Sequence, residues 1–558
     1  MTASPLLIEA YFENEDRRFL HEVLHCTQEG WLGTFARRWY LDKRPFAREL
    51  LLAYIDDGCD RPHHRVVVKH LFKDAEQAGD DEALVRFAVA FDRLVRRRWV
   101  ESRHYNHRTQ SFNVWRHLAP DTTIPSSLTA AGSTGRFSRA TRLYLCRRAF
   151  RTLRGLGHTD PPRFLAAALD ALGRYADADF PHAANVLDAW TLYHLCFWGS
   201  EAAAREPRGI YLKRDLEALL PAPIFPAVWE DATFPLLDLV ASAGATVVRL
   251  WAIRMVQARA AALGDQLPLA RILRLLLSHG AESQRLGAEL LAARTDLDTL
   301  SIDDWLQTLS LHDPTAAAIV CTLVETHVHP ANLTLAACVE LACVPLQPVA
   351  ELGLGWVRDR AGLGPDDLDA LSGLTRAAVD DVRDRAIAFL IQRLAEAPSV
   401  APERVRDLID APHADVRAHG LRLMFGDDRF RTHTGLWVAL AESPYGDVRD
   451  TLIQTLETLE AGVTPAHRHH VWASALLSVH RGSAHKRTAL RQIAARIVAC
   501  PDETDALIPL LRVALRSVRA NERRGALVQV ARAALARPDL HARLSAELPE
   551  LKLTQEVV

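Results

Sequence analysis

The feature that most constrains the fold is a tripeptide that returns at a nearly fixed interval. Asp-Val-Arg occurs at Asp381-Val382-Arg383, Asp415-Val416-Arg417 and Asp447-Val448-Arg449, with steps of 34 and 32 residues. After the third copy, apolar residues follow at helical spacing, at Val448, Leu452, Leu456 and Leu459. A recurring helical unit of about this length predicts a repeat array, in which each unit buries its apolar face by stacking on its neighbours.

A less complete form of the pattern extends over the second half of the chain. If Val382 sets the register, the equivalent positions are Val248, Gln284, Ala318, Val349, Val416, Val448, Lys486 and Arg523. Arginine directly follows most of them, at Arg249, Arg285, Arg383, Arg417, Arg449, Arg487 and Arg524. The aspartate of each triplet is suited to cap a helix, because its carboxylate can accept the unpaired N–H groups of the first turn. We expect Arg383, Arg417 and Arg449 to be structural, with hydrogen bonds to aspartates or helix-end carbonyls between repeats.

Turn residues followed by Asp-Val-Arg at the start of a second helix resemble HEAT repeats, as found in bacterial HEAT-repeat proteins. The resemblance covers roughly residues 234–540 and is strongest over 379–459. It implies stacked helix pairs that form a curved, right-handed solenoid with a concave inner face. The predicted fold class is therefore all-α, a right-handed α-solenoid of HEAT-like (armadillo-like) helix pairs with an irregular helical N-terminal part.

The rest of the chain divides by composition into four further parts. Residues 1–102 read as helices, the last of them over Glu82–Arg98. Residues 103–138 contain turn and linker residues without an apolar period, which predicts a long, partly disordered surface loop. Residues 139–229 predict irregular helical repeats, including a helix over Ile210–Leu220. The solenoid is then expected over 230–545, followed by a C-terminal tail over 546–558.

The composition is that of a soluble protein, with 49% hydrophobic and 24% charged residues. The eight cysteines form no C-x-x-C pair, the N-terminus lacks a secretory pattern, and no run of about 18 apolar residues occurs. We therefore expect a cytoplasmic protein that does not interact with a membrane.

One region departs from the balanced charge of the chain. Residues 93–154 contain fourteen arginines but only two acidic residues, Glu101 and Asp121. Aromatic residues are interleaved with these arginines, and such a surface could neutralise phosphates and stack bases. The candidate contact residues for nucleic acid or an acidic partner are Arg96, Arg97, Arg98, Tyr144, Arg147, Arg148, Arg151 and Arg154. The alternative is that these arginines pair with the acidic surface of the chain itself.

No motif for phosphate binding, nucleophilic catalysis or zinc-dependent hydrolysis occurs. The histidine clusters lack further ligands at a recognised spacing, so we expect no metal, no cofactor and no small-molecule substrate. A HEAT-like DNA glycosylase is one enzymatic alternative, with Trp190, Tyr193 and Trp198 near Asp188 as its aromatic cluster and carboxylate. Helical spacing and apolar neighbours favour a core position for these aromatics, and fold alone does not imply the activity.

The sequence therefore predicts a non-enzymatic scaffold that binds a macromolecular partner, most simply a protein, on its concave surface. The main alternative is a nucleic-acid-binding protein that uses the basic region 93–154. A nucleic-acid binder should join Arg96–Arg98 and the arginines of 147–154 in one patch, whereas a glycosylase should hold a carboxylate in an aromatic-lined pocket.

Overall fold

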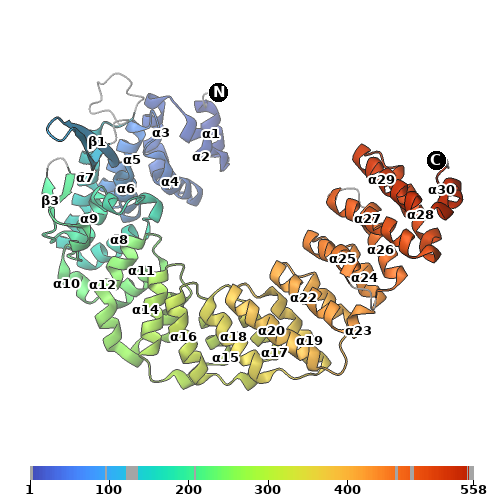
Figure 1. The fold of residues 1–558 in the computed structure, drawn as a ribbon. Coiled ribbons are helices and arrows are strands. Elements are labelled where there is room, and N and C mark those ends of the chain that lie inside the picture. Colours follow the sequence, from blue (N-terminus) through green and yellow to red (C-terminus); the bar gives the residue numbers. More distant parts are fainter. Residues whose placement is uncertain are drawn as a thin grey trace. The chain divides into compact units, whose positions relative to one another are not determined.

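The structure is a computed structural model that describes residues 4–94, 97–120, 136–206, 209–458, 463–477, 483–549 and 551. It is 74% helix and 4% strand, with 30 helices, so the predicted all-α class is confirmed. Figure 1 shows helices following one another along nearly the whole chain. The chain forms two compact units, Met1–Leu323 and Val324–Val558, which are described separately below.

The first unit opens with six helices around an aromatic core. They are α1 (Pro5–Glu13), α2 (Arg18–His25), α3 (Glu29–Leu41), α4 (Pro45–Gly58), α5 (Arg65–Ala78) and α6 (Asp81–Leu94). The rings of Phe12, Phe19 and Trp39 are buried against one another, with the Phe19 and Trp39 centroids 4.9 Å apart. Gly79 follows the last residue of α5, and its φ of 64° is the left-handed conformation that glycine adopts without steric cost.

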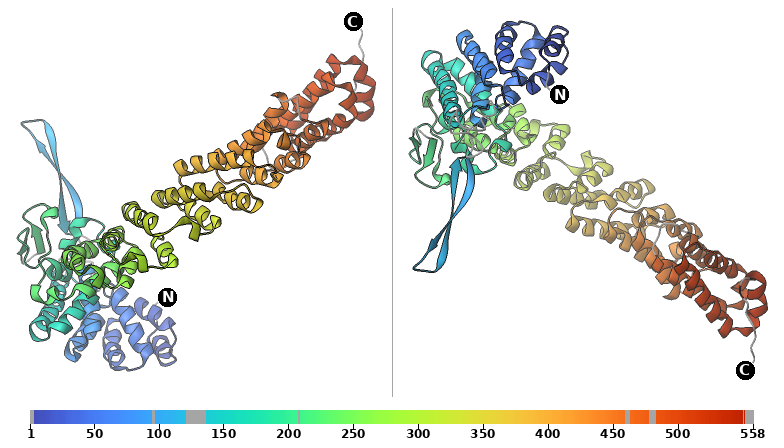
Figure 2. Two further views of the ribbon diagram at one scale, coloured as in Figure 1. Left: turned by 90° about the horizontal axis from the view of Figure 1, so that it is seen from below. Right: turned by 90° about the horizontal axis from the view of Figure 1, so that it is seen from above.

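A β-hairpin follows where a helix end and a loop were expected. Strand β1 (Arg97–Asn106) pairs antiparallel with β2 (Ser111–Pro120), so that Trp99 lies opposite Leu118 and Tyr105 opposite Phe112. Figure 2 shows the two strands as one extended ribbon. The expected helix over Glu82–Arg98 is therefore wrong at Arg97 and Arg98, which lie in β1, and the expected loop over 103–138 is wrong as far as Pro120. Residues 121–135 of that loop lie outside the described residues, and residues 136–138 are in neither a helix nor a strand.

Helices resume in the middle of the first unit. They are α7 (Arg139–Thr159), α8 (Pro161–Gly173), α9 (Trp190–Phe197) and α10 (Pro226–Glu230), and α7 packs against α6, α8 and α9. A second hairpin joins β3 (Ala203–Glu206) to β4 (Gly209–Leu212). The helix expected over Ile210–Leu220 is therefore wrong: Ile210 lies in β4, where its buried side chain alternates with exposed Tyr211.

Paired helices complete the first unit. They are α11 (Thr233–Ser242), α12 (Thr246–Leu263), α13 (Leu269–Leu276), α14 (Ala281–Ala292), α15 (Ile302–Thr308) and α16 (Pro314–His327), the last of which crosses into the second unit. Helix α11 packs on α12 and α13 on α14, and the pairs contact each other through α11 with α13 and α12 with α14.

The second unit consists of two parallel rows of helices. The first row contains α17 (Leu335–Ala342), α19 (Pro365–Ser372), α21 (Pro402–Ile409), α24 (Thr434–Ala441), α26 (Pro465–Leu477), α28 (Thr504–Leu515) and α30 (His541–Glu547). The second row contains α18 (Gln347–Arg360), α20 (Asp380–Glu396), α22 (Ala414–Gly426), α25 (Gly446–Thr458), α27 (Ser483–Ala499) and α29 (Ala520–Ala536), with the short α23 (Asp428–Arg431) between α22 and α24. Successive helices of each row contact one another, and each helix of the first row from α17 to α28 contacts its partner in the second row. The apolar side chains between the rows form the core, as expected of stacked repeats.

Across the described ranges of the chain, none of the helices is long and apolar enough to cross a membrane.

Candidate binding surfaces

The Asp-Val-Arg triplets occupy the first turns of α20, α22 and α25, all in the second row. Val382, Val416 and Val448 are buried between the rows. The aspartates lie inside the first turn and not at the N-cap position, which Val379 holds in α20 and His413 in α22. Their carboxylates are still close to the positive end of the helix dipole.

The arginines of the first two triplets each join three segments of the chain. Nε of Arg417 donates to Oδ2 of Asp447 in the next triplet, at 2.8 Å. Its Nη1 donates to the carbonyl oxygens of Ala411 and Pro412 in the preceding turn, both at 2.9 Å. The guanidinium also lies 4.0 Å from the centroid of the Tyr445 ring. These contacts connect one helix pair to the following pair, as expected of a structural motif.

Arg383 repeats the arrangement one step earlier. Its Nε donates to Oδ2 of Asp415 at 2.8 Å and its Nη1 to the carbonyl of Ala377 at 3.2 Å. Burial alone would raise the pKa of Asp415, but the hydrogen bond from Arg383, the backbone N–H of Val416 and the charge of Arg383 together outweigh burial and lower the pKa. Arg449 likewise donates to the Ser443 carbonyl.

The first unit contains the same type of contact. Arg249 donates to Glu282 at 2.6 Å and to the Ala243 carbonyl at 2.8 Å. Arg285 binds the Asp313 carboxylate through Nε at 3.0 Å and Nη2 at 2.7 Å, and this pairing lowers the pKa of Asp313. We call this series of arginine contacts the arginine ladder.

At the C-terminal end, the register expected from the sequence is wrong by one residue. Arg523, and not Arg524, donates to the turn carbonyls of Ser517 and Val518, at 3.1 and 3.3 Å. Lys486, and not Arg487, forms the ion pair with the following repeat, in which its Nζ lies 3.1 Å from Oε1 of Glu522. Arg487 and Arg524 are therefore displaced from the ladder and become exposed.

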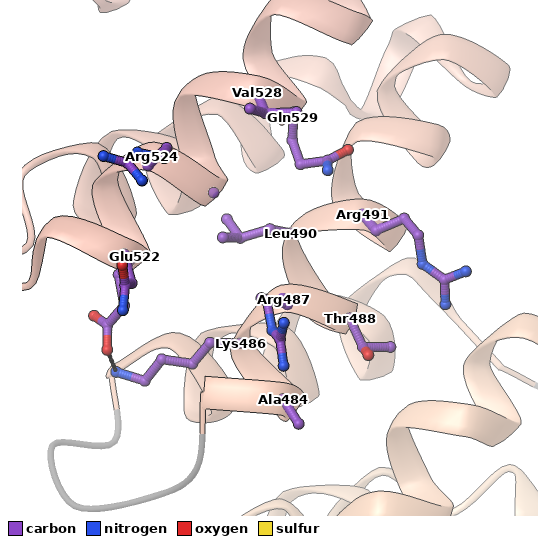
Figure 3. A pocket seen from close by; sticks show the side chains of 12 residues that line it. Ala484, Lys486, Arg487, Thr488, Leu490, Arg491, Glu522, Arg524, Val528 and Gln529 are labelled. Carbon is purple, nitrogen blue, oxygen red and sulfur yellow. Dashed lines mark ion pairs between the residues drawn. The ribbon is translucent and has the colours of Figure 1, made fainter.

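The displaced arginines line an open groove between α27 and α29, with a volume of about 780 Å³. Figure 3 shows Leu490 in the groove between Arg487 of α27 and Val528 of α29. The lining residues are Ala484, Lys486, Arg487, Thr488, Leu490, Arg491, Asn521, Glu522, Arg524, Gly525, Val528 and Gln529. Sequence reasoning missed this groove because it placed Arg487 and Arg524 at the arginine position of the repeat.

A second basic surface lies where α7 meets α9 and β3. The guanidinium of Arg147 lies 4.9 Å from the centroid of the Trp190 ring. Trp198 receives two guanidinium groups, that of Arg154 at 5.2 Å and that of Arg205 at 4.2 Å. We call these three arginines and two tryptophans the arginine–tryptophan face. Arg205 was not among the expected residues, because it follows the basic segment by about 50 residues in the sequence.

The remaining predicted contact residues are distributed differently. Tyr144 is 50% exposed, and Arg151 is exposed as well. Arg148 instead binds Glu76 through Nη2 at 2.5 Å, and this hydrogen bond lowers the pKa of the Glu76 carboxyl. Arg96 lies outside the described residues. Arg97 and Arg98 lie in β1, where only the backbone is described. The expected patch that joins Arg96–Arg98 to the α7 arginines therefore stays a prediction.

Several arginines of 93–154 pair within the chain. Arg93 binds Asp179 through Nε at 2.9 Å. Arg142 is buried and donates to Asp60 and to the carbonyls of Leu94 and Phe137, at 2.6 to 3.0 Å. Part of the positive charge in this region therefore stabilises the fold.

The glycosylase arrangement has little support from burial. Tyr193 is only 1% exposed, while Trp190 and Trp198 are half-buried and covered by arginines. Asp188 is buried and accepts a hydrogen bond from Asn185 Nδ2 at 3.0 Å. Within the described part of the chain, no three His, Cys, Asp or Glu side chains are grouped so as to hold a metal ion.

The most perturbed carboxyl group is enclosed in the core. Burial raises the pKa of Asp92 to about 7, although Tyr175 Oη donates to it at 2.7 Å and the backbone N–H of Thr191 at 2.8 Å. Asp92 is 3% exposed and accepts hydrogen bonds at the start of α9, so it is positioned to stabilise that helix.

No family model matches this chain, and no curated protein sequence matches it.

Proposed function

We propose that this protein is a non-enzymatic, HEAT-like scaffold that binds a protein partner. In this proposal the helix pairs are HEAT-like repeats of a right-handed solenoid, and the second-row helices form its concave inner surface. The observation that carries the proposal is the arginine ladder, in which buried Arg383 and Arg417 link α20 to α22 and α22 to α25. Such an array presents a long, pre-organised surface without requiring a deep pocket.

The exposed side of the second row has a composition suited to a protein partner. Neighbouring helices exchange ion pairs across this side, namely Glu351 with Arg385 and Glu457 with Arg491, and Asp450 contacts the His485 ring in the same way. Apolar side chains are exposed beside these charges, such as Leu527 at 46% and Val528 at 44%. Mixed charge with accessible apolar area is typical of non-obligate protein interfaces.

The proposal places the protein in the cytoplasm, where its eight cysteines, all free thiols, would remain reduced.

The test is affinity capture with the full chain as bait, from a nuclease-treated extract of the source cells. We expect a protein that is retained after nuclease digestion and that binds the purified chain directly. Recovery of nucleic acid alone, or of proteins that are lost on nuclease treatment, would contradict a protein-binding scaffold.

Nucleic-acid binding is the second candidate, and the arginine–tryptophan face favours it. Three guanidinium groups from α7 and β3 gather around the rings of Trp190 in α9 and of Trp198 directly after it. Their positive potential also reaches His194, whose pKa is lowered to about 4, first by burial and further by Arg205, Arg147 and Arg154. Arginine charge with aromatic planes is the combination that contacts phosphates and bases.

A labelled panel of DNA and RNA at low and at physiological salt tests this candidate. Binding that falls steeply with salt, and that is lost on replacing Arg147, Arg151 and Arg154 with Ala, would support it. Absence of binding at low salt would exclude nucleic acid as the partner of this face.

A further inference from the structure

The groove between α27 and α29 is lined by an excess of basic side chains together with apolar and amide side chains. Four basic residues line it against one acidic residue, Glu522. Apolar side chains of Leu490 and Val528 line it as well, together with the amides of Asn521 and Gln529. A ligand that fills this groove should therefore carry negative charge, offer apolar area and accept or donate hydrogen bonds.

The single carboxylate of the lining is already engaged. Glu522 accepts from Ser517 Oγ at 2.6 Å and pairs with Lys486 at 3.1 Å and Arg519 at 3.4 Å. Burial alone would raise the pKa of Glu522, but the hydrogen bonds from Ser517 and Lys486 and the charges of Lys486 and Arg519 together outweigh burial and lower the pKa. Glu522 therefore stays ionised within its own network.

The basic side chains that line the groove come from both α27 and α29. Arg487 lies in the first turns of α27 and Arg524 in the first turns of α29, and both are exposed. Arg491 pairs with Glu457 of the neighbouring helix α25 at 2.5 Å, so its charge is partly neutralised. Because the lining is drawn from the N-terminal halves of α27 and α29, the helix dipoles add to the positive potential.

We propose that this groove binds an acidic peptide segment of the protein partner. Carboxylates of the segment pair with Arg487 and Arg524, and an apolar side chain of the segment packs on Leu490 and Val528. Asn521 and Gln529 supply amides for the peptide backbone. This inference rests on the proposed scaffold function and names the chemistry of the partner.

The lining distinguishes a peptide from a nucleic acid. Not one of the twelve lining residues is aromatic, whereas surfaces that hold single-stranded nucleic acid use aromatic planes on which bases stack. Arginine pairs with carboxylates in a bidentate geometry, and an apolar floor suits an aliphatic side chain better than a phosphate backbone.

The test measures binding of a fluorescent peptide, about twelve residues long, that combines glutamates with two or three leucines. We expect the full-length protein to bind it, and the double variant Arg487→Glu/Arg524→Glu to bind at least about tenfold more weakly. The matched control is Arg532→Glu, which changes an exposed arginine on α29 outside the lining and should leave affinity within about twofold. A peptide with glutamine in place of glutamate should lose most of its affinity.

Two further measurements exclude trivial explanations. If the double variant does not fold, Arg487→Gln/Arg524→Gln replaces it, because this variant removes both charges without adding new ones. A photo-reactive residue at one leucine of the peptide should form cross-links within residues 484–491 and 521–529. Cross-links found only elsewhere would overturn the inference.

Other outcomes would also overturn it. Equal binding by the double variant, or equal binding of the glutamine peptide, would show that the groove does not recognise carboxylates. Single-stranded DNA that displaces the peptide and requires the same arginines would assign the groove to nucleic acid. If the wild-type chain captures a protein that the double variant captures equally well, only the groove is refuted. The scaffold proposal itself fails only if the wild-type chain captures no protein at all, and this outcome is distinguishable from equal capture by the two chains.

Discussion

Removing one arginine from the ladder should loosen the helix pairs on either side of it. Arg417 is the best choice, since it is 7% exposed and its contacts are complete. It donates to Asp447, Ala411 and Pro412 and stacks over Tyr445. The substitution Arg417→Ala removes all four contacts at once.

The expected loss follows from the burial of each partner. Asp447 is 45% exposed and recovers water, so the lost ion pair costs about 1 kcal/mol or less. Ala411 is 3% exposed, and its carbonyl loses a charged donor, at a cost of about 1–2 kcal/mol. Loss of the stacking on Tyr445 adds about 0.5–1 kcal/mol. Together these terms predict a destabilisation of about 3 kcal/mol.

Hydrogen exchange measured by mass spectrometry is the appropriate assay, because a long repeat array does not unfold in one cooperative step. A local loss of about 3 kcal/mol corresponds to roughly 100-fold faster exchange in α21, α22, α24 and α25. Arg422→Ala is the control, since Arg422 is an exposed arginine of the same helix and should change the free energy by about 0.5 kcal/mol at most. Equal effects of the two substitutions would refute the structural role of the ladder.

Three further outcomes test other parts of the description. Leu452→Asp buries an unpaired charge at a fully buried position of α25 and should cost more than about 4 kcal/mol, and an unchanged thermal melting profile would contradict the repeat core. Arg154→Ala should destabilise the protein by about 0.5–1 kcal/mol, because it removes the contact with Trp198, whereas Arg151→Ala should be nearly neutral. Thermal unfolding that ranks the two variants in the opposite order would contradict the assigned contacts. Burial lowers the pKa of His64 from 6.5 to about 4, so the unfolded chain binds more protons between these values and stability falls as the pH drops from 6.5 to 4. Urea titrations across this range should show a shallower fall for His64→Gln, and an identical slope would show that His64 does not contribute.

The sequence predicts the ladder because its residues sit at fixed spacing. Asp415 follows Arg383 by 32 residues and Asp447 follows Arg417 by 30, and both pairs form ion pairs in the structure. Within each triplet, the valine between the aspartate and the arginine is buried, and its helical spacing to later apolar residues indicates that the triplet begins the second helix of a pair. The repeat register becomes ambiguous where the aspartate is missing. For this reason Lys486 and Arg523 were assigned to the valine position of the repeat, although they occupy the arginine position that follows it.

The hairpin was missed for a different physical reason. Strand β1 carries charged or polar residues at Glu101, Arg103 and His104, so it shows no clean alternation of apolar and polar side chains. The pairing is set by the backbone ladder with β2, including Tyr105 opposite Phe112. Cross-strand pairing between segments of this kind has little signal in a single sequence.

The basic region could be recognised by its charge but not divided into its roles. Arg142 is buried and bound to Asp60, whereas Arg154 lies over Trp198 and Arg151 is exposed, although all three belong to one helix. Their different roles depend on partners about 40 to 80 residues away in the sequence, which no local pattern specifies.

The central claim is that a protein partner binds the exposed side of the second-row helices. The most direct measurement is hydrogen exchange of the full chain with and without the captured partner. We predict protection in α18, α20, α22, α25, α27 and α29, strongest in α27 and α29 beside the groove. Protection confined to first-row helices such as α21, α24 and α26, or to the arginine–tryptophan face, would contradict the claim.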